Sequence, residues 1–370
     1  MDCVLVFRIG SLGDSVVATP ALRCIRERFP GAHIVLLTNA PIDGGVKAAG
    51  SYQVWAGSGL IDSYLRYPIG GLRLADVRRL AGEIRRHRAT TAVYLMPRRS
   101  FVQRLRDLMF FRLAGISKVI GLKLLAHPND YPPIPGSDRF ESEARRLLRS
   151  IDEGDRDLKQ EDFSIGIDDA ERCFAASVLR HARIGVPYLV LSVGTKSLVN
   201  DWGQAHWREL VELLDARLAG VALVTIGAAS ESARCDELLD LWHGPSANFC
   251  GLLEPRQSAA VLEGAALYVG HDSGPMHLAS AVGIPVVSIF SARELPGVWF
   301  PVGNEANVFY NSPACRGCRL DVCTDKAAIC IQSIEAAPVA DRVLALLRQG
   351  RGAVARAQAG GPKLVAKSFS

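Results

Sequence analysis

The chain has 370 residues, which predicts two domains of ordinary size rather than one small module. Hydrophobic residues make up 49% of it and charged residues 22%, so a wholly disordered or low-complexity protein is excluded. The formal net charge of +5 is too small over this length to indicate nucleic-acid binding. No apolar run approaches the roughly 18 residues of a membrane-spanning helix, and the start has no export signal. With its thiols unpaired, the chain is expected in the cytoplasm, where disulfides are uncommon.

Strand and helix patterns alternate along both halves of the sequence, which predicts two parallel-sheet domains of the α/β class. In the first half, the expected strands are residues 4–7, 33–38, 91–95 and 118–120, and the expected helices are residues 16–29, 72–87 and 101–113. In the second half, the expected strands are residues 188–192, 221–226, 267–269 and 286–289, and the expected helices are residues 205–218, 231–241 and 276–281.

An acidic stretch over residues 151–169 loses the apolar period, as a linker would. We therefore expect a first domain over residues 1–165 and a second over residues 166–346. Residues 347–370 are rich in Gly, Ala, Lys and Arg without a strong period, which predicts a flexible tail. In parallel sheets, ligands bind at the carboxyl ends of the strands, so the loops that follow the strands are the places to look for chemistry.

The loop after the first strand reads Gly10-Ser11-Leu12-Gly13-Asp14. Its two glycines let a ligand approach the backbone closely, and Asp14 stands where the helix begins, where it either caps the helix or faces the cleft. The spacing differs from the G-x-G-x-x-G pattern of dinucleotide-binding loops. A dinucleotide-dependent dehydrogenase is therefore disfavoured.

A second loop, His271-Asp272-Ser273-Gly274-Pro275-Met276-His277, follows the strand at residues 267–269. Asp272 or Ser273 can cap the next helix, and Pro275 suits its first turn. The free N–H groups and the helix dipole favour a phosphate, and the small Ser273 and Gly274 let a diphosphate come close. An ordinary capped helix explains Ser273 and Pro275 but not two histidines and an aspartate, so we favour a binding site.

A third loop, after the strand at residues 188–192, contains Gly194-Thr195-Lys196. Its N–H groups, hydroxyl and ammonium all suit phosphate oxygens, although the P-loop pattern is absent. Glu231 begins the helix after the next strand, where its carboxylate could accept hydrogen bonds from a ribose; an exposed first-turn glutamate is the alternative. Trp202 and Trp207 are interpreted mainly as packing residues.

Basic residues gather after the strand at residues 91–95. Arg98 and Arg99 are followed by five more Lys or Arg residues up to residue 123, opposed only by Asp107. Such a run more often forms a solvated face than a site. Its position on the first domain also fits an anionic acceptor or an acidic membrane surface.

The nine cysteines fall into two groups. Five are scattered among apolar neighbours and are interpreted as small core residues, namely Cys3, Cys24, Cys173, Cys235 and Cys250. The other four are spaced as Cys315-x2-Cys318-x4-Cys323-x6-Cys330. Four thiolates this close in sequence could enclose one structural zinc ion; iron, disulfides and reduced thiols are the alternatives.

Together these motifs resemble glycosyltransferase family 9, the group that includes ADP-heptose:lipopolysaccharide heptosyltransferases. The resemblance runs from about residue 3 to residue 346. It rests on Arg8–Asp14 with Thr19-Pro20-Ala21-Leu22, on Gly194-Thr195-Lys196 with Trp202 and His206-Trp207, and on Asp272–Ala279. It implies a GT-B fold, in which two Rossmann-like parallel-sheet domains face each other across a cleft, with the acceptor on the first domain and the sugar nucleotide on the second.

The resemblance also implies roles for the loop residues in a metal-independent, inverting transfer from a nucleotide diphosphate sugar such as ADP-heptose. Asp14 would be the general base that takes the proton of the acceptor hydroxyl. The departing diphosphate would be bound by Thr195, Lys196 and the N–H groups around Ser273 and Gly274, so catalysis needs no cofactor. Glu231 matches the position that binds the nucleotide ribose. The remaining implied site residues are Asp272 and His277 on the donor side, and Gly10, Ser11, Gly13, Arg98 and Arg99 on the acceptor side.

The expected acceptor is a glycan, glycolipid or other hydroxyl compound in the synthesis of lipopolysaccharide or a related surface glycan, with peripheral contact at the inner face of the membrane. Two departures from the family concern the donor. Asn200-Asp201 stands where heptosyltransferases have a lysine just before the tryptophan that matches Trp202, and Phe290-Ser291-Ala292 replaces Phe/Tyr-Gly-Pro. The alternatives are therefore another nucleotide sugar with another acceptor, a non-catalytic sugar-nucleotide-binding protein, or a metalloprotein organised by the cysteine cluster. Asp14 favours an enzyme, because binding alone needs no base at that position.

Overall fold

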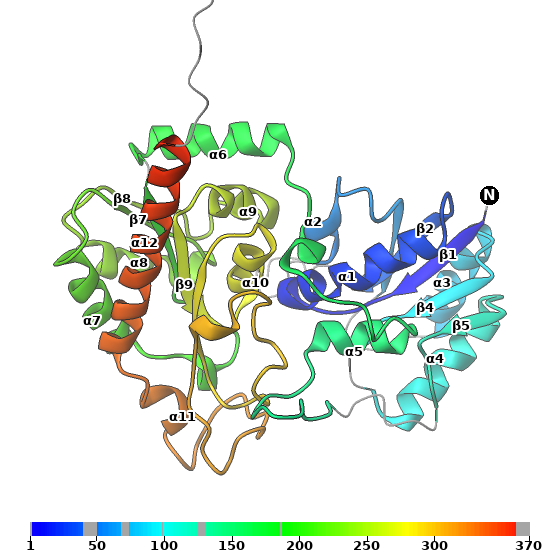
Figure 1. The fold of residues 1–370 in the computed structure, drawn as a ribbon. Coiled ribbons are helices and arrows are strands. Elements are labelled where there is room, and N and C mark those ends of the chain that lie inside the picture. Colours follow the sequence, from blue (N-terminus) through cyan, green and yellow to red (C-terminus); the bar gives the residue numbers. More distant parts are fainter. Residues whose placement is uncertain are drawn as a thin grey trace, which may run out of the picture.

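The computed structural model describes residues 2–39, 50–67, 74–97, 99–124, 131–185 and 187–359. Two parallel β-sheets with helices packed around them lie side by side, and they confirm the expected α/β class (Figure 1). In these ranges, no helix has both the length and the apolar character needed to cross a membrane.

The first sheet has the strand order β3-β2-β1-β4-β5, and all its neighbouring strands are parallel. Its strands are β1 (Cys3–Phe7), β2 (His33–Asn39), β3 (Ser63–Tyr67), β4 (Thr91–Tyr94) and β5 (Lys118–Ile120). Its helices are α1 (Leu12–Arg28), α2 (Tyr52–Trp55), α3 (Leu74–Arg86), α4 (Phe101–Leu113) and α5 (Glu143–Ser150). Because β1 is the central strand, the loop that carries Asp14 opens at the middle of the sheet edge.

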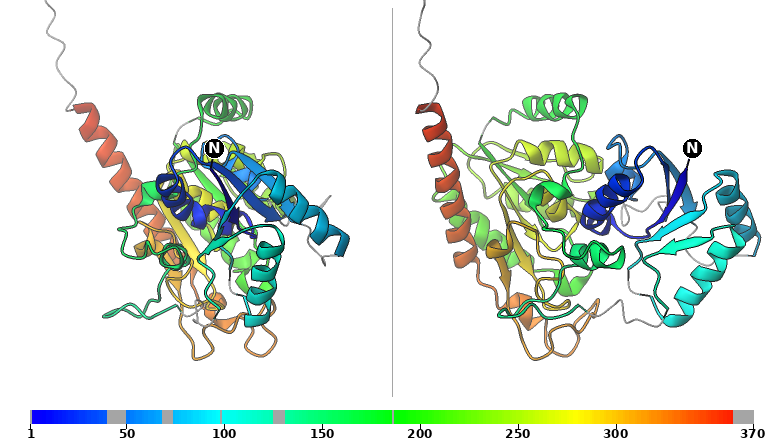
Figure 2. Two further views of the ribbon diagram at one scale, coloured as in Figure 1. Left: turned by 90° about the vertical axis from the view of Figure 1, so that its right-hand side faces the viewer. Right: turned by 45° about the vertical axis from the view of Figure 1, so that its right-hand side comes forward.

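The apolar run of β1 is buried on both faces of the sheet, as expected for the centre of a parallel sheet. Val4 and Val6 pack into one core with α1 and α5, while Leu5 and Phe7 pack into another with α3 and α4. The helices α3 and α4 therefore cover the face of the sheet opposite to α1. Figure 2 shows both of them on the side of the first sheet that is turned away from the second sheet.

The second sheet has the strand order β11-β10-β9-β6-β7-β8, again parallel throughout. Its strands are β6 (Tyr188–Ser192), β7 (Ala222–Thr225), β8 (Ser246–Asn248), β9 (Leu267–His271), β10 (Val286–Phe290) and β11 (Val308–Tyr310). Its helices are α6 (Asp169–His181), α7 (Gln204–Asp215), α8 (Ser232–Leu239), α9 (Pro255–Glu263), α10 (Gly274–Ala281), α11 (Ile329–Gln332) and α12 (Ala336–Ala359). Short 3-10 helices lie at Gln160–Phe163, Leu198–Asn200, Ala229–Glu231 and Glu305–Asn307.

Four features differ from the sequence predictions. The segment at residues 151–169 is packed rather than loose, because Phe163, Ile165 and Ile167 are buried where it crosses between the sheets. The helix α12 continues to Ala359, so the tail expected from residue 347 is helical up to that residue. Cys173 is exposed on α6 and is not a core residue, because it lies on the solvent side of a helix that is mostly exposed. The elements that were not predicted are the strands β3, β8 and β11 and the helices α2, α5, α6, α9, α11 and α12.

Candidate active site

The first turn of α1 holds Asp14 by its own backbone loop. Asp14 is the third residue of the helix, and its Oδ2 accepts hydrogen bonds from the backbone N–H of Ser11 at 2.8 Å and from the Ser11 hydroxyl at 2.7 Å. The N–H of Gly10 donates to Asn39 Oδ1 at 3.1 Å, which ties the loop to the end of β2. The Asp14 side chain is 24% exposed, so its carboxylate remains accessible from the cleft.

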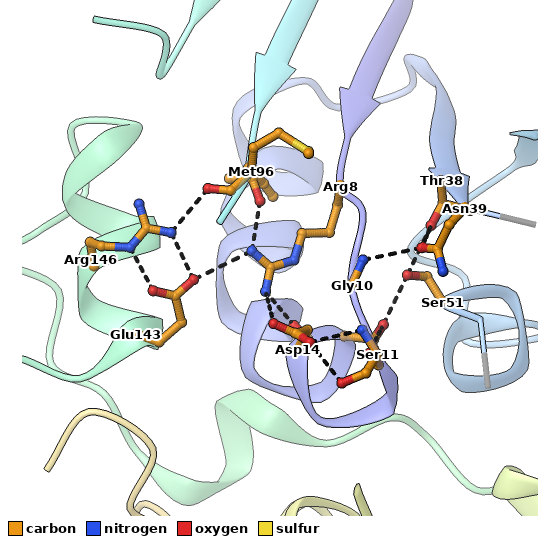
Figure 3. Close-up of polar contacts among 12 residues, drawn as sticks. Arg8, Gly10, Ser11, Asp14, Thr38, Asn39, Ser51, Met96, Glu143 and Arg146 are labelled. Atoms are coloured by element: carbon orange, nitrogen blue, oxygen red, sulfur yellow. Dashed lines mark hydrogen bonds and ion pairs between the residues drawn. The ribbon is translucent and has the colours of Figure 1, made fainter. Parts of the chain in front are cut away.

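Arg8 lies beneath this turn and is fully buried (Figure 3). Its Nη2 donates to the backbone carbonyl of Asp14 at 2.9 Å and is 3.4 Å from Asp14 Oδ1. Its Nη1 donates to the carbonyl of Leu95, at the end of β4, at 2.8 Å. The Arg8 guanidinium therefore joins the catalytic candidate to the neighbouring strand. Because Arg8 is buried, removing one partner of its ion pairs would destabilise the protein strongly.

Glu143 and Arg146, at the start of α5, continue the chain of charges that begins at Asp14 and Arg8. Glu143 Oε1 is 3.4 Å from Arg8 Nη1 and accepts from Arg146 Nη2 at 2.7 Å, and Glu143 is almost completely buried. Burial lowers the pKa of the Arg146 guanidinium, but the hydrogen bonds and charge of Glu143 raise that pKa overall. Glu143 also accepts from the Tyr131 hydroxyl at 2.8 Å. Asp14 is thus positioned by a network of alternating charges that local sequence patterns did not reveal.

The first turns of α1 and α10 meet where the two sheets come together. A Cβ atom on Gly13 would lie 2.6 Å from His277 Cδ2, and one on Gly274 would lie 2.4 Å from Leu12 Cδ2. Glycine at both positions therefore permits the close contact. His277 is buried, and its Nε2 is 3.7 Å from Asp272 Oδ1. Ser273 occupies the N-cap position of α10 but makes no side-chain capping bond, in contrast to the predicted cap.

Lys196, from the loop after β6, brings a cation toward Asp14 from the second sheet. Its side chain still contacts solvent. Partial burial lowers the pKa of the Lys196 ammonium overall, although the nearby Asp14 carboxylate opposes this shift. Thr195 is half-buried beside it. The general-base candidate and the predicted phosphate cation therefore come from different sheets and are near enough to interact electrostatically.

Glu231 lies against the two loops that follow β6 and β7. A Cβ atom on Gly194 or on Gly227 would lie 2.0 Å from the Glu231 carboxyl group, so the carboxyl group lies directly over the backbone of both glycines. Burial raises the pKa of Glu231, while the hydrogen bond from the Ala228 N–H, at 3.0 Å, opposes this shift. Glu231 is thus a partly buried acceptor at the end of β7, rather than an exposed first-turn residue.

The loop that contains Thr195 and Lys196 is braced by the cysteine-rich segment. The Ser197 hydroxyl donates to Asp321 Oδ1 at 2.9 Å and accepts from Arg293 Nη1 at 2.7 Å. Arg293 also forms an ion pair with Asp321 at 3.1 Å. Asp321 lies between Cys318 and Cys323, so the fold of that segment affects the position of the loop that contains Thr195 and Lys196. Sequence reasoning missed this brace, because Ser197 is 96 positions from Arg293 and 124 positions from Asp321 in the chain.

His271 has a structural role in the described residues. Its Nε2 accepts the backbone N–H of Trp202 at 3.0 Å, and its ring packs edge-on against Trp207. Both tryptophans are fully buried, which confirms that they are packing residues. Complete burial lowers the pKa of His271 to about 4, against the opposing charge of Asp201.

The low pKa of His271 predicts a pH-dependent stability. Below pH of about 6.5 the unfolded chain binds a proton that the folded imidazole does not take up until about pH 4, so the free energy of unfolding falls across this window. We expect this residue to contribute a loss of up to about 3 kcal/mol. Urea unfolding from pH 7 to pH 4 should show a shallower decline in His271→Gln than in the wild type. The exposed His181→Gln is the control, and equal slopes in all three proteins would contradict the assignment.

The four clustered cysteines do not form a ready metal site in this structure. The described residues contain no group of three or more His, Cys, Asp or Glu side chains placed to hold a metal ion. Burial raises the pKa of the Cys330 thiol, and the nearby Cys315 and Cys318 raise it further, so these three thiols do lie in one region. The described positions of these thiols do not form the four-thiolate site that the spacing predicted.

The structure thus brings most of the predicted site residues to one place. Gly10, Ser11, Gly13 and Asp14 meet Lys196, Gly274 and His277 between the sheets, with Asp272 beside His277. Arg99 is half-buried in the loop between β4 and α4, and Arg98 lies outside the described residues. Glu143 and Arg146 are additions. The signal available for them was weak, namely a serine followed by charged residues at helical spacing in Ser142-Glu143-Ala144-Arg145-Arg146.

Two parallel-sheet domains with loops from both sheets facing one another are the architecture of a GT-B glycosyltransferase. The family model of glycosyltransferase family 9 (heptosyltransferase) matches residues 142–328, about half of the chain. The chain belongs to this family, as the sequence motifs predicted.

A curated relative and two solved structures agree with the family. The chain is 32% identical over 150 residues to lipopolysaccharide heptosyltransferase 1 of Pseudomonas aeruginosa. The aligned residues make up 40% of this chain and 40% of that protein. It is similar in fold to a glycosyltransferase family 9 structure from Veillonella parvula (TM-score 0.73, 16% identity, covering 94% of this chain and 98% of that one). It is also similar to E. coli ADP-heptose LPS heptosyltransferase II (TM-score 0.67, 17% identity, covering 95% and 100%). These likenesses confirm the GT-B fold.

A further structural neighbour is an iron-containing protein. It is the iron-containing dodecameric glycosyltransferase TibC from enterotoxigenic E. coli, with a TM-score of 0.57 and 14% identity, covering 94% of this chain and 77% of that one. At this identity the likeness concerns the fold alone. The metal content of the cysteine cluster stays a prediction for this chain.

Proposed function

We propose that this protein is an inverting glycosyltransferase that transfers heptose from ADP-heptose to an acceptor hydroxyl in the synthesis of lipopolysaccharide or a related surface glycan. The observation that carries the proposal is the contact between the first turns of α1 and α10, which places Asp14 of the first domain where its charge acts on Lys196 of the second. A base on one domain and a phosphate-binding cation on the other would serve the two sides of a sugar bound between the domains. The similarity to a lipopolysaccharide heptosyltransferase and to an ADP-heptose heptosyltransferase supports heptose as the sugar and ADP-heptose as the donor.

In this proposal Asp14 removes the proton from the acceptor hydroxyl. The acceptor oxygen forms a bond to the anomeric carbon, and the bond from that carbon to the diphosphate oxygen breaks on the opposite side. The electron pair leaves with ADP. Attack opposite to the leaving group inverts the anomeric centre, and the proton is retained on the Asp14 carboxyl until solvent removes it.

The leaving diphosphate gains negative charge as the bond breaks, so groups that bind it more tightly at that moment accelerate transfer. Lys196 supplies a full positive charge, Thr195 supplies a hydroxyl, and the first turn of α10 supplies N–H groups and the positive end of a helix dipole. These fixed groups supply the charge stabilisation that a divalent metal supplies in metal-dependent transferases. The Glu231 carboxylate accepts hydrogen bonds from the ribose hydroxyls of the donor.

A thermal-shift panel of nucleoside diphosphates tests the donor half of the proposal. ADP is expected to raise the melting temperature of the full chain more than UDP, GDP or CDP, since a ligand stabilises the folded state according to its affinity. In Lys196→Met, loss of one charge-assisted contact is expected to weaken ADP binding about 10- to 100-fold. The exposed Lys326→Met is the matched control. A larger shift with another nucleoside diphosphate would show that the donor carries a different nucleobase. An unchanged ADP response in Lys196→Met would remove that residue from the site.

A further inference from the structure

The helix α4 presents a row of large apolar side chains to solvent. Its five members are between 38% and 72% exposed and are Phe101, Val102, Leu105, Met109 and Leu113. An α-helix turns by about 100° per residue, so these five side chains project within an arc of about 120°. The opposite side of the helix is buried and anchors it to the sheet through Phe111. Single exposed apolar residues are ordinary, but a continuous row along one helix marks an interaction surface.

Positive charge surrounds this apolar row. Residues 74–118 contain eleven Lys and Arg against three Asp and Glu, so the segment has a net charge of +8 when the whole chain has only +5. Two of the three acids, Asp76 and Glu83, form ion pairs with Arg79. The third, Asp107, is buried and holds Arg106 at 2.9 Å. Exposed cations on α3, α4 and the turns beside them are Arg78, Arg85, Arg86, Arg88, Arg112 and Lys118.

The two helices form one face of the molecule. Arg85 of α3 donates to the carbonyl of Leu113, the last residue of α4, at 2.6 Å, so the arginines and the apolar row are adjacent. Both helices lie on the side of the first sheet that is turned away from the second sheet (Figures 1 and 2). Among the described residues, therefore, none of the second domain covers this face.

We propose that α3 and α4 form a docking surface for an anionic lipid bilayer, with α4 lying in the plane of the interface. A helix with an apolar row beside cationic side chains inserts the row at the boundary between headgroups and acyl chains, while arginines bind the headgroup phosphates. A second copy of the chain fits less well, because a symmetric contact would bring the same positive face against itself.

The docking surface begins next to the candidate active site. The loop from β4 to α4 starts at Leu95 and Met96, whose carbonyls accept from Arg8 and Arg146, the residues that position Asp14. A lipid-linked acceptor whose lipid stays in the bilayer would therefore reach the cleft from the side of α4. This last step rests on the proposed function, whereas membrane binding itself does not.

Vesicle flotation of the full chain tests the docking surface. The wild type is expected to float with vesicles of phosphatidylglycerol and phosphatidylcholine, and much less with phosphatidylcholine alone or at high salt. The double variant Leu105→Gln/Met109→Gln should bind the anionic vesicles at least about 10-fold more weakly, since two apolar side chains no longer enter the interface. Leu252→Gln, at an exposed leucine of the second domain, is the matched control. The pair Arg78→Gln/Arg86→Gln should weaken binding only at low salt.

Three results would overturn the docking proposal. They are equal flotation with neutral and anionic vesicles, unchanged flotation of Leu105→Gln/Met109→Gln, and a wild-type dimer in sedimentation that this variant turns into a monomer. The last result would assign the face to a second copy. An ADP thermal shift on the double variant confirms that it is folded. If the wild type floats but shows no response to any nucleotide, the proposed transferase function fails and the docking surface stands.

Discussion

Replacing Asp14 by Asn is expected to abolish sugar transfer while the donor still binds. Asparagine retains the size of the side chain and an oxygen that can accept the Ser11 N–H, but it cannot take a proton from the acceptor. Loss of a general base costs about 10²- to 10⁴-fold in rate. Steady-state transfer with ADP-heptose, beside the ADP thermal shift, should show this fall in kcat with an unchanged affinity for ADP.

Asp169→Asn is the matched control for Asp14→Asn, because Asp169 also stands in the first turn of a helix but is almost fully exposed. Its transfer rate should equal that of the wild type. Turnover of Asp14→Asn within a few-fold of the wild type would remove Asp14 from the reaction. In the wild type, the anomeric configuration of the product, read by NMR, should be opposite to that of the donor, and a chelator should leave the rate unchanged. A retained configuration would contradict the mechanism.

Replacing Glu143 by Ala is expected to destabilise the protein by about 3–5 kcal/mol, because it leaves two buried guanidinium groups without their shared carboxylate. Arg8 is fully buried and Arg146 nearly so, and water cannot replace the lost charge. In a domain of about 150–250 residues a loss of 1 kcal/mol lowers the melting temperature by about 2–4 °C, so calorimetry should show a fall of about 10 °C in the unfolding of the first domain. Glu27→Ala removes an exposed partner of Arg156, and its effect should stay below about 1 kcal/mol.

Glu143→Gln separates the positioning role from stability. Glutamine retains the size of the side chain and one carbonyl oxygen, so more of this variant should fold, but the charge that holds Arg8 beside Asp14 is lost. We expect kcat to fall by about tenfold or more with an unchanged affinity for ADP, since a small displacement of a catalytic group is costly. A variant that is less stable but retains the wild-type kcat would limit Glu143 to a structural role.

Local patterns in the sequence were sufficient for most of the regular elements and for the loops of the site. The apolar run of β1 and the glycines and aspartate after it occur together in eleven residues, and the same holds for β9 and the start of α10. The elements that escaped prediction had weaker patterns. The strand β3, for example, carries Arg66 and is only partly buried, and α5 is eight residues long and rich in arginine.

The network around Asp14 was not predicted, for a different reason. Arg8 and Glu143 are 135 positions apart, and Lys196 and Asp14 belong to different sheets, so no periodicity connects them. Their contact depends on how the carboxyl ends of the strands and the start of α5 come together after folding. The cysteine cluster shows the same limit, because close spacing in the chain did not place the thiols around a common centre.

The sequence by itself determined the α/β class, the family and the loops that carry the site, because apolar periodicity and glycine-containing loop motifs are local properties of the chain. It also determined that a positive segment lies in the first half. Only the tertiary structure decided that Arg8, Glu143 and Arg146 hold Asp14, and that the apolar residues of α4 face solvent rather than the core. The buried residues of α4 are Arg104, Asp107 and Phe111, so its apolar pattern does not reveal which side is covered, and the packing of the helix against the sheet decides it.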